Sequence, residues 1–172
     1  MRPLFRIILR SLACIALVLV FVFAYSMWSL ATPHSEQEAW RAVEKGQSVS
    51  TLSGILPESA TKFCYARSSV GLGGRFKAFA VDGSPNELIE FARAEFAAHW
   101  DAPKTRVTES TTSPFSSDQI SFLEEAYAVD LEWLRASVGR KGTIFRAANG
   151  EVSHMPTIFV DPSGLLYFVM TD

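Results

Sequence analysis

The hydrophobic pattern of the chain begins with one long stretch near the N-terminus. Residues 11–31 carry no charged side chain. Within them, the nineteen residues from Leu12 to Leu30 would extend roughly 28 Å as a helix at about 1.5 Å per residue, close to a bilayer's hydrocarbon core of about 30 Å. The pattern predicts a single transmembrane helix at residues 11–31.

The charges on either side of this stretch predict its orientation. Arg2, Arg6 and Arg10 precede it, and the first cation after it is Arg41. Because loops rich in Arg and Lys stay in the cytoplasm, we expect residues 1–10 there and the rest of the chain outside a bacterial plasma membrane. A cleaved signal peptide is the alternative, because small residues at positions 29 and 31 would allow cleavage there. The length of the uncharged stretch favours a retained anchor.

Residues 32–61 have no clear apolar pattern. His34–Gln47 is rich in charged residues, and we interpret it as a short helix leaving the membrane, ended by Gly46. Gln47–Thr61, with its serines, glycine and proline, is typical of a loop. The sequence therefore predicts a stalk and linker at residues 32–61, before a domain at residues 62–172.

The domain opens with two alternating segments around a glycine-rich turn. Phe63–Ser69 and Arg75–Asp82 alternate between apolar and polar residues, which predicts a β-hairpin. Ser84–Trp100 follows and has the features of an amphipathic helix. Ser84, Pro85 and Glu87 are typical of a helix N-terminus, and the apolar stripe that follows is interrupted only at Glu95.

The second half of the domain predicts one more helix and several strands. Residues 105–109 suit a short strand, and a helix starts at Ser117–Asp118 and reaches about Ala128, with a less clear continuation. Three β-rich segments follow: residues 142–147, 157–160 and 165–170. The fold class is α+β, with a mostly antiparallel sheet of four to six strands and the Ser84–Trp100 helix packed on one face.

The net charge of the exported part excludes one class of partner. Without the three N-terminal arginines, 13 cations face 18 acidic residues, a net charge of −5. Nucleic-acid-binding domains carry basic surfaces, so we expect no nucleic-acid partner. The overall charge also gives no reason to expect the domain to dock onto anionic lipid.

The exported part contains one cysteine, Cys64, which cannot form an internal disulfide. Its apolar surroundings favour burial as a small hydrophobic residue, and an intermolecular disulfide is the alternative. The domain must therefore fold on its hydrophobic core alone.

The sequence predicts no catalytic, cofactor-binding or metal-binding residues. The glycines at residues 71–74 lack the spacing of a phosphate-binding loop. His99 and Asp101 lie close together, but no further ligands follow at metal-site spacing. Arg67, Arg75 and Lys77 gather near the predicted hairpin, where they form either an anion site or an ordinary solvated strand face.

Several short motifs resemble a group of small bacterial single-pass membrane proteins of uncharacterised function. The similar residues are Leu56–Thr61, Tyr65, Gly71-Leu72, Arg75-Phe76, Asp161, Tyr167 and Thr171-Asp172. The resemblance implies an extracytoplasmic α+β domain. It implies no known activity, so no catalytic residue follows from it.

Three functions remain open. The preferred one is a membrane-tethered binding or interaction domain, without cofactor, whose partners are the lipid bilayer through residues 11–31 and a protein of the cell envelope. An envelope hydrolase is the second, in which His99 or His154 would serve as base, although no Gly-x-Ser-x-Gly motif occurs. The third is a small accessory subunit of a membrane complex that acts through its anchor helix.

Overall fold

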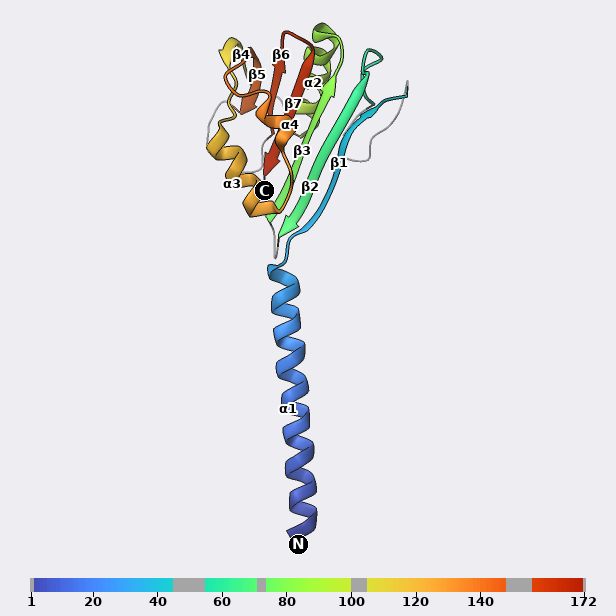
Figure 1. Cartoon of the computed structure of the whole chain (residues 1–172), viewed down its shortest axis with the longest axis vertical. Coiled ribbons are helices and arrows are strands. Elements are labelled where there is room, and N and C mark those ends of the chain that lie inside the picture. The colour runs from blue at the N-terminus through green and yellow to red at the C-terminus, as the bar shows by residue number, and fades with distance from the viewer. Residues whose placement is uncertain (1, 45–54, 71–73, 100–104, 148–155, 172) are drawn as a thin grey trace.

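The computed structural model describes residues 2–44, 55–70, 74–99, 105–147 and 156–171. They form one long N-terminal helix and an α+β domain built on an antiparallel sheet (Figure 1). The predicted fold class is confirmed at this level.

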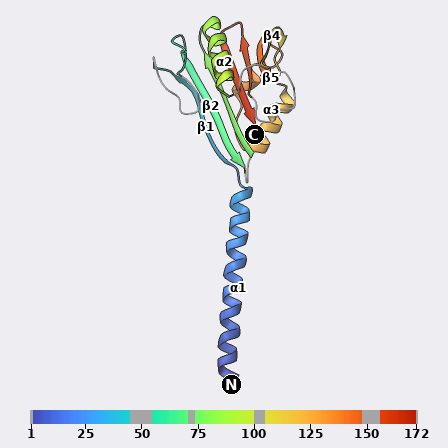
Figure 2. The same ribbon diagram turned by 180° about the vertical axis from the view of Figure 1, so that it is seen from behind.

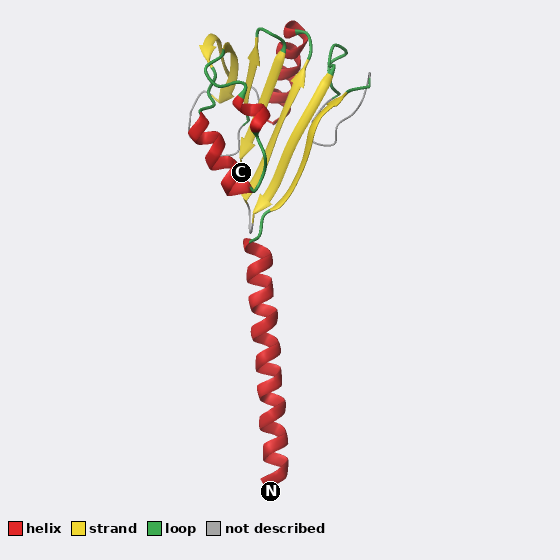
Figure 3. Cartoon of the chain, viewed as in Figure 1, coloured by secondary structure: helices red, strands yellow, loops and turns green. Residues whose placement is uncertain are grey.

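Helix α1, Arg2–Ala31, extends away from the domain (Figure 3). Its side chains are described for residues 14–29, and all of these are exposed. Among the described residues, no helix is both long and apolar enough to cross a membrane. The placement of residues 1–10 in the cytoplasm and of residues 11–31 in a bilayer stays a prediction.

Seven strands form the sheet in the order β1-β2-β3-β7-β6-β5-β4, and every neighbouring pair is antiparallel. The prediction of four to six strands was too low. The strands are β1 His34–Ala42, β2 Lys62–Val70, β3 Gly74–Asp82, β4 Thr105–Thr112, β5 Lys141–Ala147, β6 Thr157–Asp161 and β7 Leu165–Thr171.

Strand β1 corrects the sequence interpretation. The helix predicted at His34–Gln47 is wrong, because residues 34–42 pair with β2, from His34 opposite Ser69 to Ala42 opposite Lys62. β1 lies at an edge of the sheet, and most of its side chains are exposed. An exposed edge strand commonly carries charged residues on both faces, so it lacks the alternation by which the hairpin was found.

Helices cover both faces of the sheet. α2, Pro85–His99, lies on one face, as predicted, and contacts β5, β6 and β7 (Figure 2). α3, Ser117–Tyr127, and the short α4, Glu132–Arg135, lie on the opposite face. Ser116 caps the N-terminus of α3, and the helix ends at Tyr127 because the next residue, Ala128, has a φ of 51°, which cannot continue a helix.

Alternation along the strands explains the two cores. Phe63, Phe79 and Phe168 point toward α2, together with Leu88 and Phe96 of that helix. Strand residues of opposite parity, among them Cys64, Ala78 and Tyr167, form the second core with Ile120 of α3 and Leu134 of α4. Both faces of the central strands are therefore apolar, although the outermost strand β1 is not.

Cys64 lies within the second core and is fully buried. Burial raises the pKa of its thiol to about 12. The interpretation of Cys64 as a buried hydrophobic residue is confirmed, and a disulfide between molecules would require the sheet to open.

A turn at residues 161–164 joins β6 to β7. The N–H of Gly164 donates to the carbonyl of Asp161 at 3.0 Å, and the Gly164 φ of 95° favours glycine. Asp161 is buried and accepts a hydrogen bond from Arg140 at 2.6 Å. Although burial opposes it, hydrogen bonds from Ser163 and Arg140 hold the pKa of Asp161 below its ordinary value.

Candidate functional site

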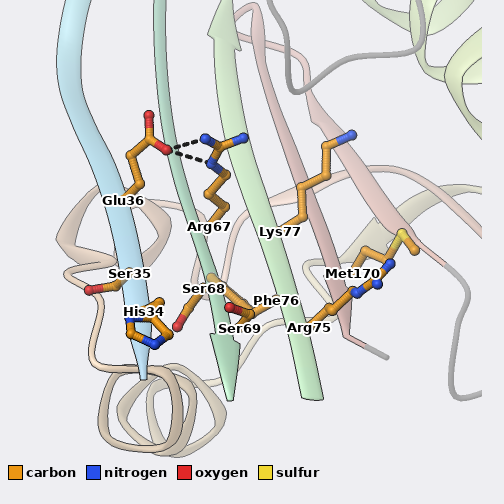
Figure 4. Close-up of a pocket in the computed structure, with 10 residues that line it drawn as sticks. All are labelled: His34, Ser35, Glu36, Arg67, Ser68, Ser69, Arg75, Phe76, Lys77 and Met170. Carbon is orange, nitrogen blue, oxygen red and sulfur yellow. Dashed lines mark hydrogen bonds and ion pairs between the residues drawn. The ribbon is translucent and has the colours of Figure 1, made fainter. Parts of the chain in front are cut away.

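A pocket of about 630 Å³ lies at the end of the sheet where α1 joins the domain (Figure 4). It is lined by the start of β1, the end of β2, the start of β3 and the end of β7. We call it the basic pocket, after its charged and polar lining residues His34, Glu36, Arg67, Ser69, Arg75 and Lys77.

Strand register explains why these side chains meet. Glu36 pairs with Arg67, which pairs with Lys77, so the three form one row across β1, β2 and β3. His34, Ser69 and Arg75 form the next row toward α1. Residues two apart in a strand share a face, and neighbouring strands are about 4.8 Å apart. Both rows therefore lie on the same face of the sheet.

Glu36 is the acidic residue of this lining. Its carboxylate accepts a hydrogen bond from the Tyr65 hydroxyl at 2.7 Å and another from Arg67 Nε at 2.7 Å, and it also pairs with the terminal guanidinium nitrogen of Arg67. The hydrogen bond from Tyr65, and then that from Arg67, hold the pKa of Glu36 below its ordinary value. The same hydrogen bond raises the pKa of Tyr65.

Lys77 is the least exposed cation of the pocket. Its Nζ lies 5.5 Å from the centre of the Phe168 ring, within the range of a cation–π interaction. Burial lowers the pKa of Lys77, and the charge of Glu95 partly opposes this effect. Glu95, which interrupts the apolar stripe of α2, is 2 % exposed. The charge of Glu95 therefore acts on a cation of the pocket across the helix–sheet boundary.

Arg75 and His34 differ from the other cationic groups in their surroundings. Both side chains are exposed. Within the described part of the chain, neither has a hydrogen bond or an ion pair. The guanidinium of Arg75 is thus available to a ligand.

The sequence predicted part of this site. It named Arg67, Arg75 and Lys77, and the structure brings them together. It missed His34 and Glu36, because their segment was interpreted as a helix. The side chain of His99 lies outside the described residues, as do Asp101 and His154. Among described residues, no group of His, Cys, Asp and Glu side chains could hold a metal ion.

A second pocket, of about 330 Å³, follows the next part of β1. We call it the acidic pocket, after its lining residues Glu38, Trp40, Tyr65, Asp130, Glu132 and Trp133. The backbone N–H of Asp130 donates to the Gln37 side chain at 2.8 Å, which ties the segment before α4 to β1.

The sequence matches no protein-family model, and it matches neither a curated protein nor a solved structure. The chemistry of the site therefore follows from its own residues. The basic pocket concentrates cations and hydroxyl groups, a combination suited to holding an anion by charge and hydrogen bonds.

Proposed function

We propose that the protein is a single-pass protein of the bacterial plasma membrane whose outer domain binds a ligand or an envelope protein. In this proposal residues 11–31 cross the bilayer, residues 1–10 lie in the cytoplasm and residues 32–172 lie outside. The observation that carries it is the uncharged segment of residues 11–31, which lies in helix α1 and extends away from the domain (Figure 1).

The exposure of α1 supports the membrane part of the proposal. Its large apolar side chains are more than half exposed, for example Leu19 at 63 %, Phe23 at 68 % and Trp28 at 69 %. Apolar surface costs about 25 cal/mol per Å² in water, so such a helix needs an apolar environment. The arginines before it and the acids after it favour a bilayer with the N-terminus inside.

The basic pocket supports the binding part. It holds charged groups at a fixed place in the sheet, and its cations outnumber its acids. Within the described residues, no hydrogen bond joins the His34 imidazole to a serine hydroxyl, so the pocket favours binding over nucleophilic catalysis.

Membrane extraction of the full-length protein tests the proposal. Wild-type protein should stay in the membrane pellet after alkaline carbonate and keep the mass of an uncleaved chain. A variant with Leu19→Asp and Val22→Asp should be released, because charged groups at the bilayer centre cost several kcal/mol, whereas Ser26→Ala should behave as wild type. Release of the wild type, or a mass beginning at Thr32, would contradict the anchor.

Orientation needs a separate measurement. Protease added to intact spheroplasts should digest a C-terminally tagged domain and spare a cytoplasmic control protein. Protection of the domain until the cells are lysed would reverse the proposed topology.

The exposure of α1 also favours a second candidate, an accessory subunit whose helix contacts other membrane helices. Replacing residues 12–30 with an unrelated membrane helix separates the two. Retained function after the replacement means that α1 only tethers the domain, and lost function with intact membrane insertion favours the accessory subunit.

A further inference from the structure

We propose that the basic pocket binds a phosphate-bearing anion at the end of the sheet beside α1. The lining contains the cationic side chains of Arg67, Arg75 and Lys77 and one carboxylate, that of Glu36. This local excess of positive charge lies in a part of the chain whose net charge is −5. A concave cluster of one sign focuses the electrostatic potential and attracts ions of the other sign.

The strand register gives the first argument. Arg67 and Lys77 lie directly opposite each other on β2 and β3. Like charges at such positions destabilise a sheet. Glu36 compensates Arg67 from β1, and the charge of Glu95 acts on Lys77 from α2. Among the described residues, Arg75 forms no ion pair. A bound dianion between these side chains would offset the remaining repulsion.

The types of donor give the second argument. Guanidinium groups match phosphate oxygens in a bidentate geometry, and a lysine ammonium adds a compact charge. The exposed Ser69 hydroxyl lies in the same row as Arg75 and adds a neutral donor. Arginine, lysine and serine together suit the three oxygens of a phosphate group.

The size of the pocket gives the third. A volume of about 630 Å³ exceeds the needs of one phosphate group and lies within the usual range for small organic ligands, about 300–1,000 Å³. Phe76 and Met170 add apolar atoms to the lining. The ligand is therefore a phosphate ester with an organic portion, in which the phosphate contacts the cations.

Two sources of such a ligand are compatible with the position of the pocket. β1 begins at His34, three residues after α1 ends at Ala31, so the pocket lies at headgroup level if α1 is in a bilayer. The lipid source rests on the proposed membrane anchorage. A soluble phosphate ester requires only the pocket.

The test uses the full-length protein in a neutral detergent. Binding of glycerol phosphate is measured by calorimetry, and retention of phosphatidylglycerol against phosphatidylcholine by native mass spectrometry. The variant carries Arg75→Gln and Lys77→Gln. Its matched control carries Lys62→Gln and Arg93→Gln, which remove the same charge from described positions outside the pocket lining.

We expect the pocket variant to bind at least tenfold more weakly and the control to stay within twofold of wild type. If the pocket variant loses every ligand that the wild type binds, the site is supported. If the wild type binds phosphatidylglycerol alone, the ligand is a lipid headgroup. If it binds glycerol phosphate alone, the ligand is a soluble ester. If the double variant is unfolded by circular dichroism, Arg75→Gln alone, at an exposed position, carries the same comparison.

Two results would overturn the inference: wild-type protein that binds neither ligand at millimolar concentration, or equal binding by wild type and the pocket variant. Failure of the anchor is recognised separately. If carbonate releases the wild-type protein from the membrane but the protein still binds glycerol phosphate through Arg75, the proposed anchor is wrong and the proposed anion site stands.

Discussion

The two pockets along β1 show how the same strand can serve opposite chemistry. Its first residues, His34–Glu36, line the basic pocket, and the next, Gln37–Trp40, line the acidic pocket. A hydrogen bond joins the two linings, because Tyr65 lines the acidic pocket and its hydroxyl donates to Glu36 in the basic pocket.

The pockets differ in how far their charges are compensated. In the acidic pocket, Glu38 pairs with Arg41 at 3.2 Å and Glu132 with Arg135 at 3.3 Å. Asp130 Oδ1 accepts the N–H of Glu132 at 3.0 Å, at the start of α4. These carboxylates therefore form contacts within β1 and at α4. The basic pocket holds Arg75, which has no such contact among the described residues. Both pockets contain charged side chains, but the basic pocket contains a charge without an ion pair in the described part of the chain. This difference is why we propose the basic pocket as the binding site.

The largest expected effect comes from reversing that uncompensated charge. Arg75→Glu places two carboxylates in the basic pocket in place of one, and we expect glycerol phosphate to bind about a hundredfold more weakly, a loss of about 2.8 kcal/mol. Calorimetry on the full-length protein measures the change. Unaltered affinity would show that Arg75 does not face the ligand and would remove the main difference between the pockets.

A smaller effect of opposite sign is expected from Glu36→Gln. The amide oxygen still accepts the hydrogen bond from Tyr65, while the negative charge beside Arg67 is lost. Glycerol phosphate should therefore bind about three- to tenfold more tightly. Glu38→Gln, the neighbouring change in the acidic pocket, is the matched control and should leave the affinity unaltered. Weaker binding by Glu36→Gln would mean that its charge is needed to position Arg67.

Elements whose pattern lies within one short segment of the sequence were predictable, and elements formed by distant contacts were not. The hairpin of β2 and β3 was predictable because alternation and a glycine-rich turn fix its register, and that register brings Arg67 and Lys77 together. β1 was not predictable in this way. Its polar side chains on both faces give no period of two, and hydrogen bonds to β2 make it a strand. His34 and Glu36 were therefore missing from the predicted site.

Glu95 shows a second limit. The sequence marked it as a break in an apolar stripe, but a stripe cannot show which residue of another element lies beneath the break. The structure buries Glu95 where its charge acts on Lys77. Buried charges are tolerated when other charges or hydrogen bonds compensate them, so a charged residue in an apolar stripe indicates a tertiary partner without identifying it.

The pH dependence of binding sharpens the contrast further. Burial lowers the pKa of Lys77, so Lys77 loses its proton at a lower pH than an exposed lysine, whose pKa is about 10.4. As pH rises through that lowered pKa, the affinity for glycerol phosphate should fall, while the ligand keeps its charge because its second pKa is about 6.

Lys77→Arg tests the cause of this decline. A guanidinium stays protonated throughout the range, so the variant should keep its affinity at alkaline pH where the wild type loses several-fold. Affinities measured by calorimetry from about pH 7 to pH 10 give both profiles. Identical profiles would assign the decline to another group of the pocket.

The smallest effect is expected in the acidic pocket itself. The Glu132 side chain is 81 % exposed, and its ion pair with Arg135 is of the surface type. Glu132→Gln should change the free energy of unfolding by less than about 0.5 kcal/mol, measured by thermal denaturation, and should leave glycerol phosphate affinity within twofold. Glu132 is compensated, and it belongs to the lining of the other pocket. A large gain in affinity would show that the charge of Glu132 acts on the ligand in the basic pocket. The two pockets would then be coupled electrostatically, although the charge of Glu132 is compensated by Arg135.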